Sequence, residues 1–133
     1  MDSLTVALVG ISQIDVTLGV IVFWIVLGLL GLSTVRRRGF VAHVLFPLGA
    51  VGGLVLAAAG FLAMAAPPET RVLVLGLPDL PFHLRLDALS AFFLLLLGAA
   101  SAGISIYSAG YMREEDATLP GLHGLLYHLF LAS

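Results

Sequence analysis

The chain has no cysteine and no lysine, and charged residues of either sign are scarce. The absence of cysteine excludes disulfide bonds, cysteine zinc sites, iron–sulfur clusters and thiol nucleophiles within the chain. All six basic residues are arginine, which is too few to track a phosphate backbone, so nucleic-acid binding is excluded as well. Any redox chemistry must therefore belong to a partner protein.

Apolar residues dominate what is present. They make up 60% of the 133 residues, against 11% that are charged. A soluble domain usually carries about 25% charged residues. The charged residues of this chain provide too little polar surface to cover a water-soluble protein of this size. A soluble enzyme and a disordered linker are therefore excluded.

Three long intervals of the chain carry no formal charge. They are residues 16–35, 39–68 and 88–112. Each is long enough for the roughly 20 residues with which a helix crosses about 30 Å of hydrocarbon. Three such intervals in one short chain disfavour the alternative, a buried helix of a soluble protein. We therefore expect an all-α membrane protein with three transmembrane helices, at about residues 14–35, 41–66 and 88–110.

A fourth uncharged interval, residues 117–133, predicts the start of a fourth helix at about residues 120–133, after Pro120 and Gly121. About a dozen residues rise only about 20 Å, which is less than a full crossing. A terminal carboxylate in hydrocarbon is costly. We therefore expect this chain, a single membrane region over residues 1–133, to be the N-terminal piece of a longer polypeptide. The alternative is a short re-entrant or interfacial tail.

The arginines predict the orientation, because cytoplasmic loops collect basic residues. Arg36, Arg37, Arg38 and Arg113 fall on one side of the predicted spans, and only two arginines fall on the other. We expect a multi-pass protein of the cell inner membrane with its N-terminus outside. The acidic start of the chain lacks the positive region of a signal peptide, so we expect the first span to remain uncleaved.

Between the second and third spans the pattern changes to that of a β-hairpin, at about residues 70–86. Two β-prone runs, residues 71–75 and 82–86, flank a turn-rich stretch. A lone hairpin is marginally stable in water, so we expect it to lie on neighbouring loops. Asp87 then opens the third span. Capping of that helix is the favoured interpretation, ahead of an ion-entry carboxylate or a pair with Arg85.

Small residues at a spacing of four predict close helix packing in a membrane. Such pairs begin at Gly49, Gly53, Gly98 and Ala99. The hydroxyls of Ser101, Ser105 and Ser108 can bond helix carbonyls or a neighbouring helix. Trp24 falls in the middle of the first span, where we expect it to pack against another helix. Tyr107 and Tyr111 suit the point where the third span leaves the membrane.

Ionisable side chains within the spans are few. Gln13 and Asp15 are expected at the outer edge of the first span, and His43 near the cytoplasmic start of the second. His43 is interpreted as an interfacial hydrogen-bonded histidine, with a proton relay as the alternative. His123 and His128 are five residues apart, about 140° around a helix, and do not share a face as a metal pair does.

The run Glu114-Glu115-Asp116 is interpreted as a solvated acidic loop. The sequence contains no nucleophile–base pair, phosphate loop or carboxylate dyad. We therefore expect no catalytic, cofactor-binding or metal-binding residues in this chain.

Three stretches resemble a known family: LPFHLRLDALSAFF (residues 80–93), IYSAGYMRE (106–114) and LYHLFLAS (126–133). They are similar to the N-terminal region of the antiporter-like proton-translocating membrane subunits. That family includes the large membrane-arm subunits of respiratory complex I, the Mrp-type antiporters and membrane-bound hydrogenase subunits. The likeness is closest to component B of hydrogenase-4 and its formate hydrogenlyase counterpart. Over residues 1–79 only the two-span layout agrees.

The resemblance implies a non-catalytic membrane subunit of an oxidoreductase complex, which couples a partner's electron transfer to proton movement. Its partners would be the lipid bilayer and the other membrane subunits of a respiratory or hydrogenase complex. In such proteins the proton path uses glutamate and lysine residues of later helices, and no residue of this chain matches them. The alternative is a small self-contained scaffold or assembly subunit without transport activity.

Overall fold

A computed structural model describes residues 3, 11–34, 36–77, 80–114 and 120–133. The elements are α2 (Gln13–Ser33), α3 (Arg38–Phe40), the π-helical turn η1 (Val41–Leu45), α4 (Phe46–Met64), β1 (Glu69–Leu77), β2 (Leu80–Leu86), α5 (Ala88–Glu114) and α6 (Pro120–Ala132). Three helices are long and apolar enough to cross a membrane. The predicted fold is confirmed, since a fourth helix follows them and a two-stranded antiparallel hairpin separates the second and third.

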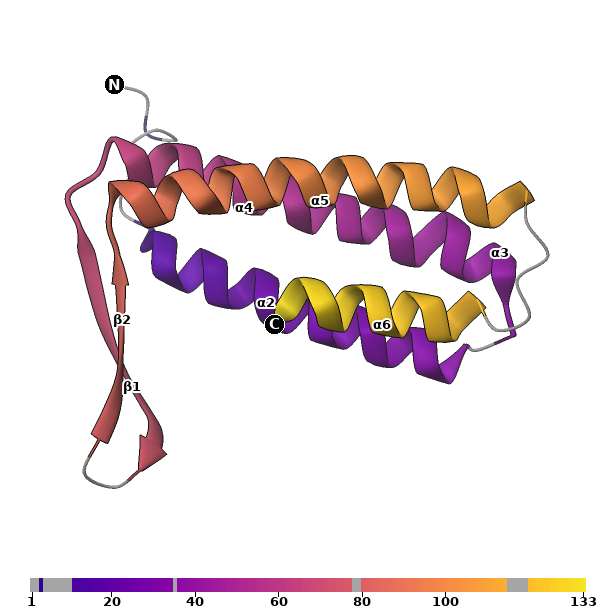
Figure 1. Cartoon of the computed structure of the whole chain (residues 1–133), viewed down its shortest axis with the longest axis horizontal. Helices are drawn as coiled ribbons and strands as arrows, with labels where there is room; N and C mark the ends of the chain where they lie inside the picture. The colour runs from indigo at the N-terminus through magenta and orange to yellow at the C-terminus, as the bar shows by residue number, and fades with distance from the viewer. Residues whose placement is uncertain (1–2, 4–10, 35, 78–79, 115–119) are drawn as a thin grey trace.

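The helices form two pairs (Figure 1). α4 packs along α5, α2 packs along α6, and α2 joins the pairs through its contact with α4. The hairpin lies at the end of the bundle where α2 begins, and α3 lies at the opposite end. The hairpin and the turn that contains Arg36 and Arg37 therefore lie at opposite ends of the helices.

The second span contains a local change of helix geometry next to Pro47. The backbone N–H of Phe46 bonds to the carbonyl of Val41, five residues earlier. Proline has no N–H to continue the ordinary ladder. The π-helical turn lets the chain pass this point without ending the helix, so Val41–Met64 runs as one apolar segment.

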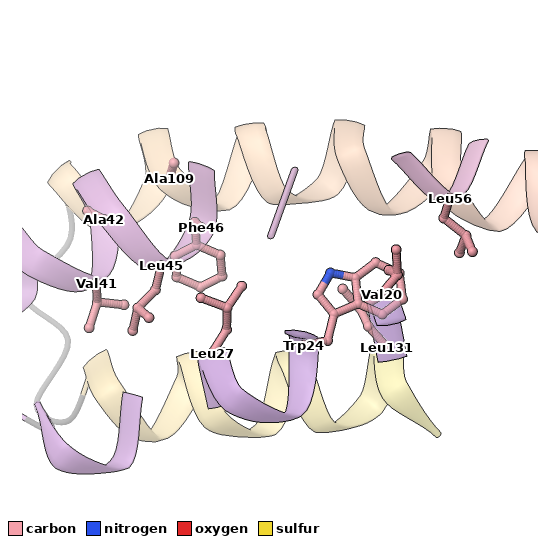
Figure 2. Close-up of a cluster of buried hydrophobic side chains, with 10 residues drawn as sticks. All are labelled: Val20, Trp24, Leu27, Val41, Ala42, Leu45, Phe46, Leu56, Ala109 and Leu131. Atoms are coloured by element: carbon pink, nitrogen blue, oxygen red, sulfur yellow. The ribbon is translucent and has the colours of Figure 1, made fainter. Parts of the chain in front are cut away.

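The core lies between the two helix pairs (Figure 2). Trp24 and Leu27 of α2 meet Leu45 and Phe46 at the junction of η1 and α4, and all four are almost fully buried. Leu131 of α6 joins the same cluster. The expectation that Trp24 packs against another helix is confirmed, because it is 1% exposed and its Nε1 donates a 3.3 Å hydrogen bond to the Gly49 carbonyl.

Glycine permits the close approach of α4 and α5. A Cβ atom on Gly53 would lie 2.6 Å from Ser101 Oγ and 2.8 Å from the Gly98 carbonyl oxygen. One on Gly60 would lie 2.7 Å from the carbonyl oxygen of Ala91. The prediction of close packing through Gly53 and Gly98 is confirmed. The second motif on α5 packs on no described segment of this chain, because Ala99 and Gly103 are exposed and a Cβ on Gly103 would meet nothing within 4 Å.

The hairpin differs from expectation in its placement. Its strands pair from Glu69↔Leu86 to Leu77↔Leu80, with an irregularity between Leu73 and Gly76. It extends away from the helix ends instead of lying on neighbouring loops (Figure 1). Only its base packs: Leu86 joins a buried cluster with Ile14, Ala63 and Ala91, while Val74 is fully exposed. Within the described residues, the hairpin contacts the helices near its base, through residues such as Glu69, Arg71 and Leu86.

Parts of three predicted features lie outside the described residues. They are the first two residues of the chain, residues 78–79 of the predicted turn, and residues 115–116 of the acidic run.

Candidate functional site

Polar side chains gather inside the bundle where α4, α5 and α6 meet. His128 of α6 is completely buried, and so are Ser101 and Ser105 of α5. Tyr127, beside His128 on α6, is half-buried. Polar groups at membrane depth are costly unless they are paired, and they mark candidate functional sites.

Hydrogen bonds join α5 to α6 through hydroxyl groups. The Tyr127 hydroxyl donates a 3.1 Å bond to the backbone carbonyl of Ser101. It also lies 2.7 Å from Ser105 Oγ. Because the tyrosine proton points to the carbonyl, the Ser105 hydroxyl is the donor to Tyr127 in this arrangement. The prediction that the serines of this span bond carbonyls or a neighbouring helix is confirmed for Ser105, and also for Ser101, whose Oγ donates to Gly98.

The His128 ring has one satisfied nitrogen and one orphaned nitrogen. Nδ1 lies 2.7 Å from the carbonyl oxygen of Gly124, one helical turn earlier. A carbonyl only accepts, so Nδ1 carries the proton, and in a neutral ring Nε2 is then a bare acceptor. Among the described residues, Nε2 has no hydrogen-bond partner. The Leu45 backbone is near the ring but is not a hydrogen-bond partner of Nε2.

Gly49 provides the space into which His128 Nε2 points. A Cβ atom at this position would lie 2.6 Å from Nε2 and 3.3 Å from Ser105 Oγ. The two polar atoms therefore face the same point on α4. Phe46 covers them, with its ring centroid 5.9 Å from that of His128 and 5.4 Å from that of Tyr127.

A second polar arrangement lies at the hairpin end of the bundle, where β1 caps α2. Glu69 Oε2 accepts a 2.8 Å hydrogen bond from Ser12 Oγ and a longer one from the Ile14 backbone N–H, and Oε1 accepts one from Gln13. A carboxylate at a helix N-terminus satisfies free N–H groups and complements the helix dipole. Partial burial alone would raise the pKa of Glu69. The hydrogen bonds from Ser12, Ile14 and Gln13, helped by the charge of Arg71, instead hold that pKa below its ordinary value.

Two further carboxylates at this end are paired. Asp15 forms an ion pair with Arg71 of β1, and both side chains are about half exposed. Asp87 Oδ1 accepts a 2.9 Å hydrogen bond from the backbone N–H of Ser90. The bonds from Ser90 lower the pKa of Asp87. The prediction that Asp87 caps the third span is confirmed.

The structure separates the remaining predicted polar residues. His43 is exposed and its Nδ1 lies 2.9 Å from the Gly39 carbonyl oxygen, which fits the hydrogen-bonded interpretation. His123 is exposed whereas His128 is buried, so the two do not share a face. Gln13 is buried at the start of α2 and donates to Ile11. Tyr107 and Tyr111 are exposed and stack on one another with centroids 6.3 Å apart.

Sequence reasoning did not identify Tyr127 and His128 as a site. It tested His128 only as half of a metal pair. The available signal was the presence of two ring side chains with polar atoms inside an apolar helix, which is unusual at membrane depth. The sequence does not show that α6 pairs with α2. This pairing buries His128 inside the bundle.

Comparison with known proteins gives one family. Residues 73–120 match the family model described as NADH-Ubiquinone oxidoreductase (complex I), chain 5 N-terminus. The resemblance inferred from sequence is thereby confirmed over β1 from Leu73, β2, α5 and the connection to Pro120. Residues 126–133, which also carried the resemblance, lie outside the matched segment. No curated protein matches the chain. With its three apolar helices, this multi-pass membrane protein is therefore similar, over residues 73–120, to the N-terminal segment of the antiporter-like subunits of complex I.

Proposed function

We propose that this chain is the N-terminal membrane region of a proton-translocating antiporter-like subunit. The subunit would work in a hydrogenase-4-like or complex I-like assembly, where it would couple a partner's electron transfer to proton movement. The observation that carries the proposal is the family match over residues 73–120. The matched segment includes all of α5, which packs along α4 and holds two of the buried serines.

The distribution of charge supports a bracing role for these helices. Within the described residues, the carboxylates Asp15, Glu69 and Asp87 lie at the hairpin end of the helices, and Arg36 and Arg37 are exposed at the other end. The chain contains no lysine. The glutamate and lysine residues that the family uses would therefore come from other helices, and this region would hold those helices in place. We extend this proposal to the whole of residues 1–133 as a single membrane region.

We further propose that the protein is in the cell inner membrane with its N-terminus outside. Arg36 and Arg37 are exposed at the end opposite the hairpin, and basic residues favour the cytoplasmic side. In this orientation the hairpin is outside. Its contacts to the α2 N-terminus, made through Glu69 and Arg71, then also lie on the outer side.

The test of the proposed function is proton uptake by inverted membrane vesicles. Vesicles containing the assembly are energised with its electron donor and read with a pH-sensitive dye. We expect removal of this chain to abolish proton uptake while the peripheral subunits still oxidise the donor. Undiminished proton uptake without the chain would contradict the proposal.

One observation favours the scaffold alternative. The α4–α5 contact is closed by small residues such as Gly53 and Gly98, which suits rigid support. If the scaffold function is correct, removal of the chain disperses the other membrane subunits on native gels. A full-size assembly that lacks the chain but no longer moves protons would instead support the translocation function.

A further inference from the structure

We propose that His128 is a proton-accepting group inside the helix bundle, and that the hydroxyls of Ser105 and Tyr127 deliver protons to it. The site lies in this N-terminal region and uses none of the glutamate and lysine residues of later helices. It rests on the proposed function for its physiological meaning, but its existence is testable in this chain alone.

A hydrogen bond fixes the tautomer of the neutral His128 ring. The 2.7 Å bond from Nδ1 to the Gly124 carbonyl holds the proton on Nδ1. A neutral His128 therefore presents a lone pair at Nε2, and the described residues provide no donor to it. A buried acceptor without a partner is unfavourable. The surroundings thus leave Nε2 of the neutral ring without a hydrogen bond.

Protonation of Nε2 would change the hydrogen bonding and the charge of the ring. With a proton on Nε2, the ring would donate from both nitrogens, to Gly124 on one side and toward Leu45 on the other. Burial opposes the positive charge, because a charged group loses its hydration in the bundle. Hydrogen bonding therefore favours the charged ring and desolvation favours the neutral one. A histidine between opposed effects of this kind is suited to gain and lose a proton.

Two hydroxyl groups near the ring provide a source of protons. Ser105 Oγ and His128 Nε2 face the same point at Gly49, where glycine leaves room for both. In the observed arrangement Ser105 donates to Tyr127. A turn of the Ser105 side chain toward Nε2, with rotation of the Tyr127 hydroxyl hydrogen, reverses the direction, so that Tyr127 donates to Ser105 and Ser105 donates to Nε2. Ser105 then gives its proton to Nε2 and takes one from Tyr127, Tyr127 takes one from a hydronium ion of the solvent, and the imidazole becomes imidazolium.

The surroundings contain few competing groups. From the elements packed against it, the ring is faced by Gly28 of α2, Phe46 and Gly49 of α4, and Ser105 of α5. Tyr127 is the titratable neighbour on its own helix. None of these named groups carries a charge at neutral pH, so the proton on Nε2 would be the charge of the site.

His43 provides a matched control within the same chain. Its Nδ1 bonds to the carbonyl four residues earlier, at 2.9 Å, as that of His128 does at 2.7 Å. The difference is burial: His43 is exposed and His128 is not. Any behaviour of His128 that His43 lacks therefore comes from the buried surroundings.

The test is nitrogen NMR of the full chain with labelled histidine in lipid nanodiscs, over a range of pH. His128→Asn and His43→Asn identify the two signals. We expect His128 at high pH to show a protonated Nδ1 and a bare Nε2, and Nε2 to gain a proton as the pH falls. Ser105→Ala should slow the proton exchange of His128 and leave that of His43 unchanged. The proposal is overturned if Nε2 is protonated at every pH, or if it stays bare down to the pH at which the chain unfolds.

A second experiment separates this proposal from the proposed function. His128→Asn keeps a donor near the Nδ1 position and removes Nε2. In the vesicle assay we expect this variant to lose most of the proton uptake, and His43→Asn to retain it. If vesicles with the unaltered chain take up no protons although His128 titrates, the proposed function fails and the site stands. If vesicles with a folded His128→Asn chain take up protons normally, the site has no part in translocation and this inference fails.

Discussion

The hydroxyl of Ser12 donates a 2.8 Å hydrogen bond to the carboxylate of Glu69, and so joins the start of the first membrane helix to the first strand of the hairpin. The two residues are far apart in the sequence. The same carboxylate accepts backbone N–H bonds from Gln13 and Ile14. A strand residue therefore serves as the cap of α2, in place of a residue preceding the helix.

This cap predicts a pH dependence of stability. The pKa of Glu69 in the folded chain lies below its ordinary value of 4.5. Its stabilising contribution is therefore complete above pH 4.5 and is lost as the pH falls through the folded-state pKa. We expect unfolding in lipid nanodiscs to become easier on acidification below that range. Glu69→Gln keeps an acceptor for Ser12 but should remove this part of the pH dependence; an unchanged profile would contradict the assignment.

Removal of the cap side chain should cost more than removal of the neighbouring ion pair. Glu69→Ala is expected to destabilise the chain by about 0.5–2 kcal/mol, the range for loss of a helix cap. Asp15→Asn breaks the pair with Arg71, whose side chains are about half exposed, and such pairs contribute only about 0–1 kcal/mol. High salt should reduce the effect of Asp15→Asn and leave most of the effect of Glu69→Ala. The reverse order would show that the ion pair, not the cap, fixes the hairpin.

Two glycines of α5, Gly98 and Gly103, provide a matched pair of substitutions that tests the packing of α4 on α5. A Cβ at Gly98 would overlap the backbone of α4 at Gly53 and Ala57, whereas one at Gly103 would meet nothing within 4 Å. We expect Gly98→Ala to destabilise the chain by about 1–3 kcal/mol. Gly103→Ala should be neutral or stabilising, because alanine favours a helix over glycine by about 0.5–1 kcal/mol. Denaturation in mixed micelles measures both, and equal effects would exclude this interface.

Trp24 connects α2 to α4 by packing and by one hydrogen bond, and the two contributions are separable. Trp24→Phe removes the 3.3 Å bond to the Gly49 carbonyl, which is worth about 0.6 kcal/mol by the average for such bonds between membrane helices. Trp24→Ala also leaves a cavity and should cost about 3–5 kcal/mol. The same denaturation measurement distinguishes them. A Trp24→Phe variant as unstable as Trp24→Ala would show that the hydrogen bond dominates.

The spans, the hairpin and the cap at Asp87 were predictable because each depends on local pattern. Uncharged runs, Pro67-Pro68 after the second span, and an aspartate directly before an apolar helix carry that information within a few residues. The packing of Gly53 against Gly98 was also predictable from small-residue spacing. The same spacing at Ala99 and Gly103 meets no described segment of this chain, because a spacing identifies a helix face but not the neighbour that covers it.

The candidate site at His128 and the cap at Glu69 were not predictable, for one physical reason. Both depend on contacts between segments distant in the sequence. His128 is buried because α6 packs on α2 and η1, and Glu69 reaches α2 because the hairpin begins beside it. The placement of the hairpin was mispredicted for the same reason, since its distance from other loops is set by the whole bundle.

The most direct test of the account is the sidedness of two single cysteines introduced into a chain that has none. Gly39→Cys lies on α3, where a side chain meets open space, and Val74→Cys lies on the fully exposed part of the hairpin, at the opposite end of the helices. With an impermeant thiol reagent on intact cells, we expect Val74→Cys to be labelled and Gly39→Cys to be labelled only after the membrane is opened. Labelling of both from the same side would contradict a chain that spans the membrane in this way, and labelling in the reverse order would contradict its orientation.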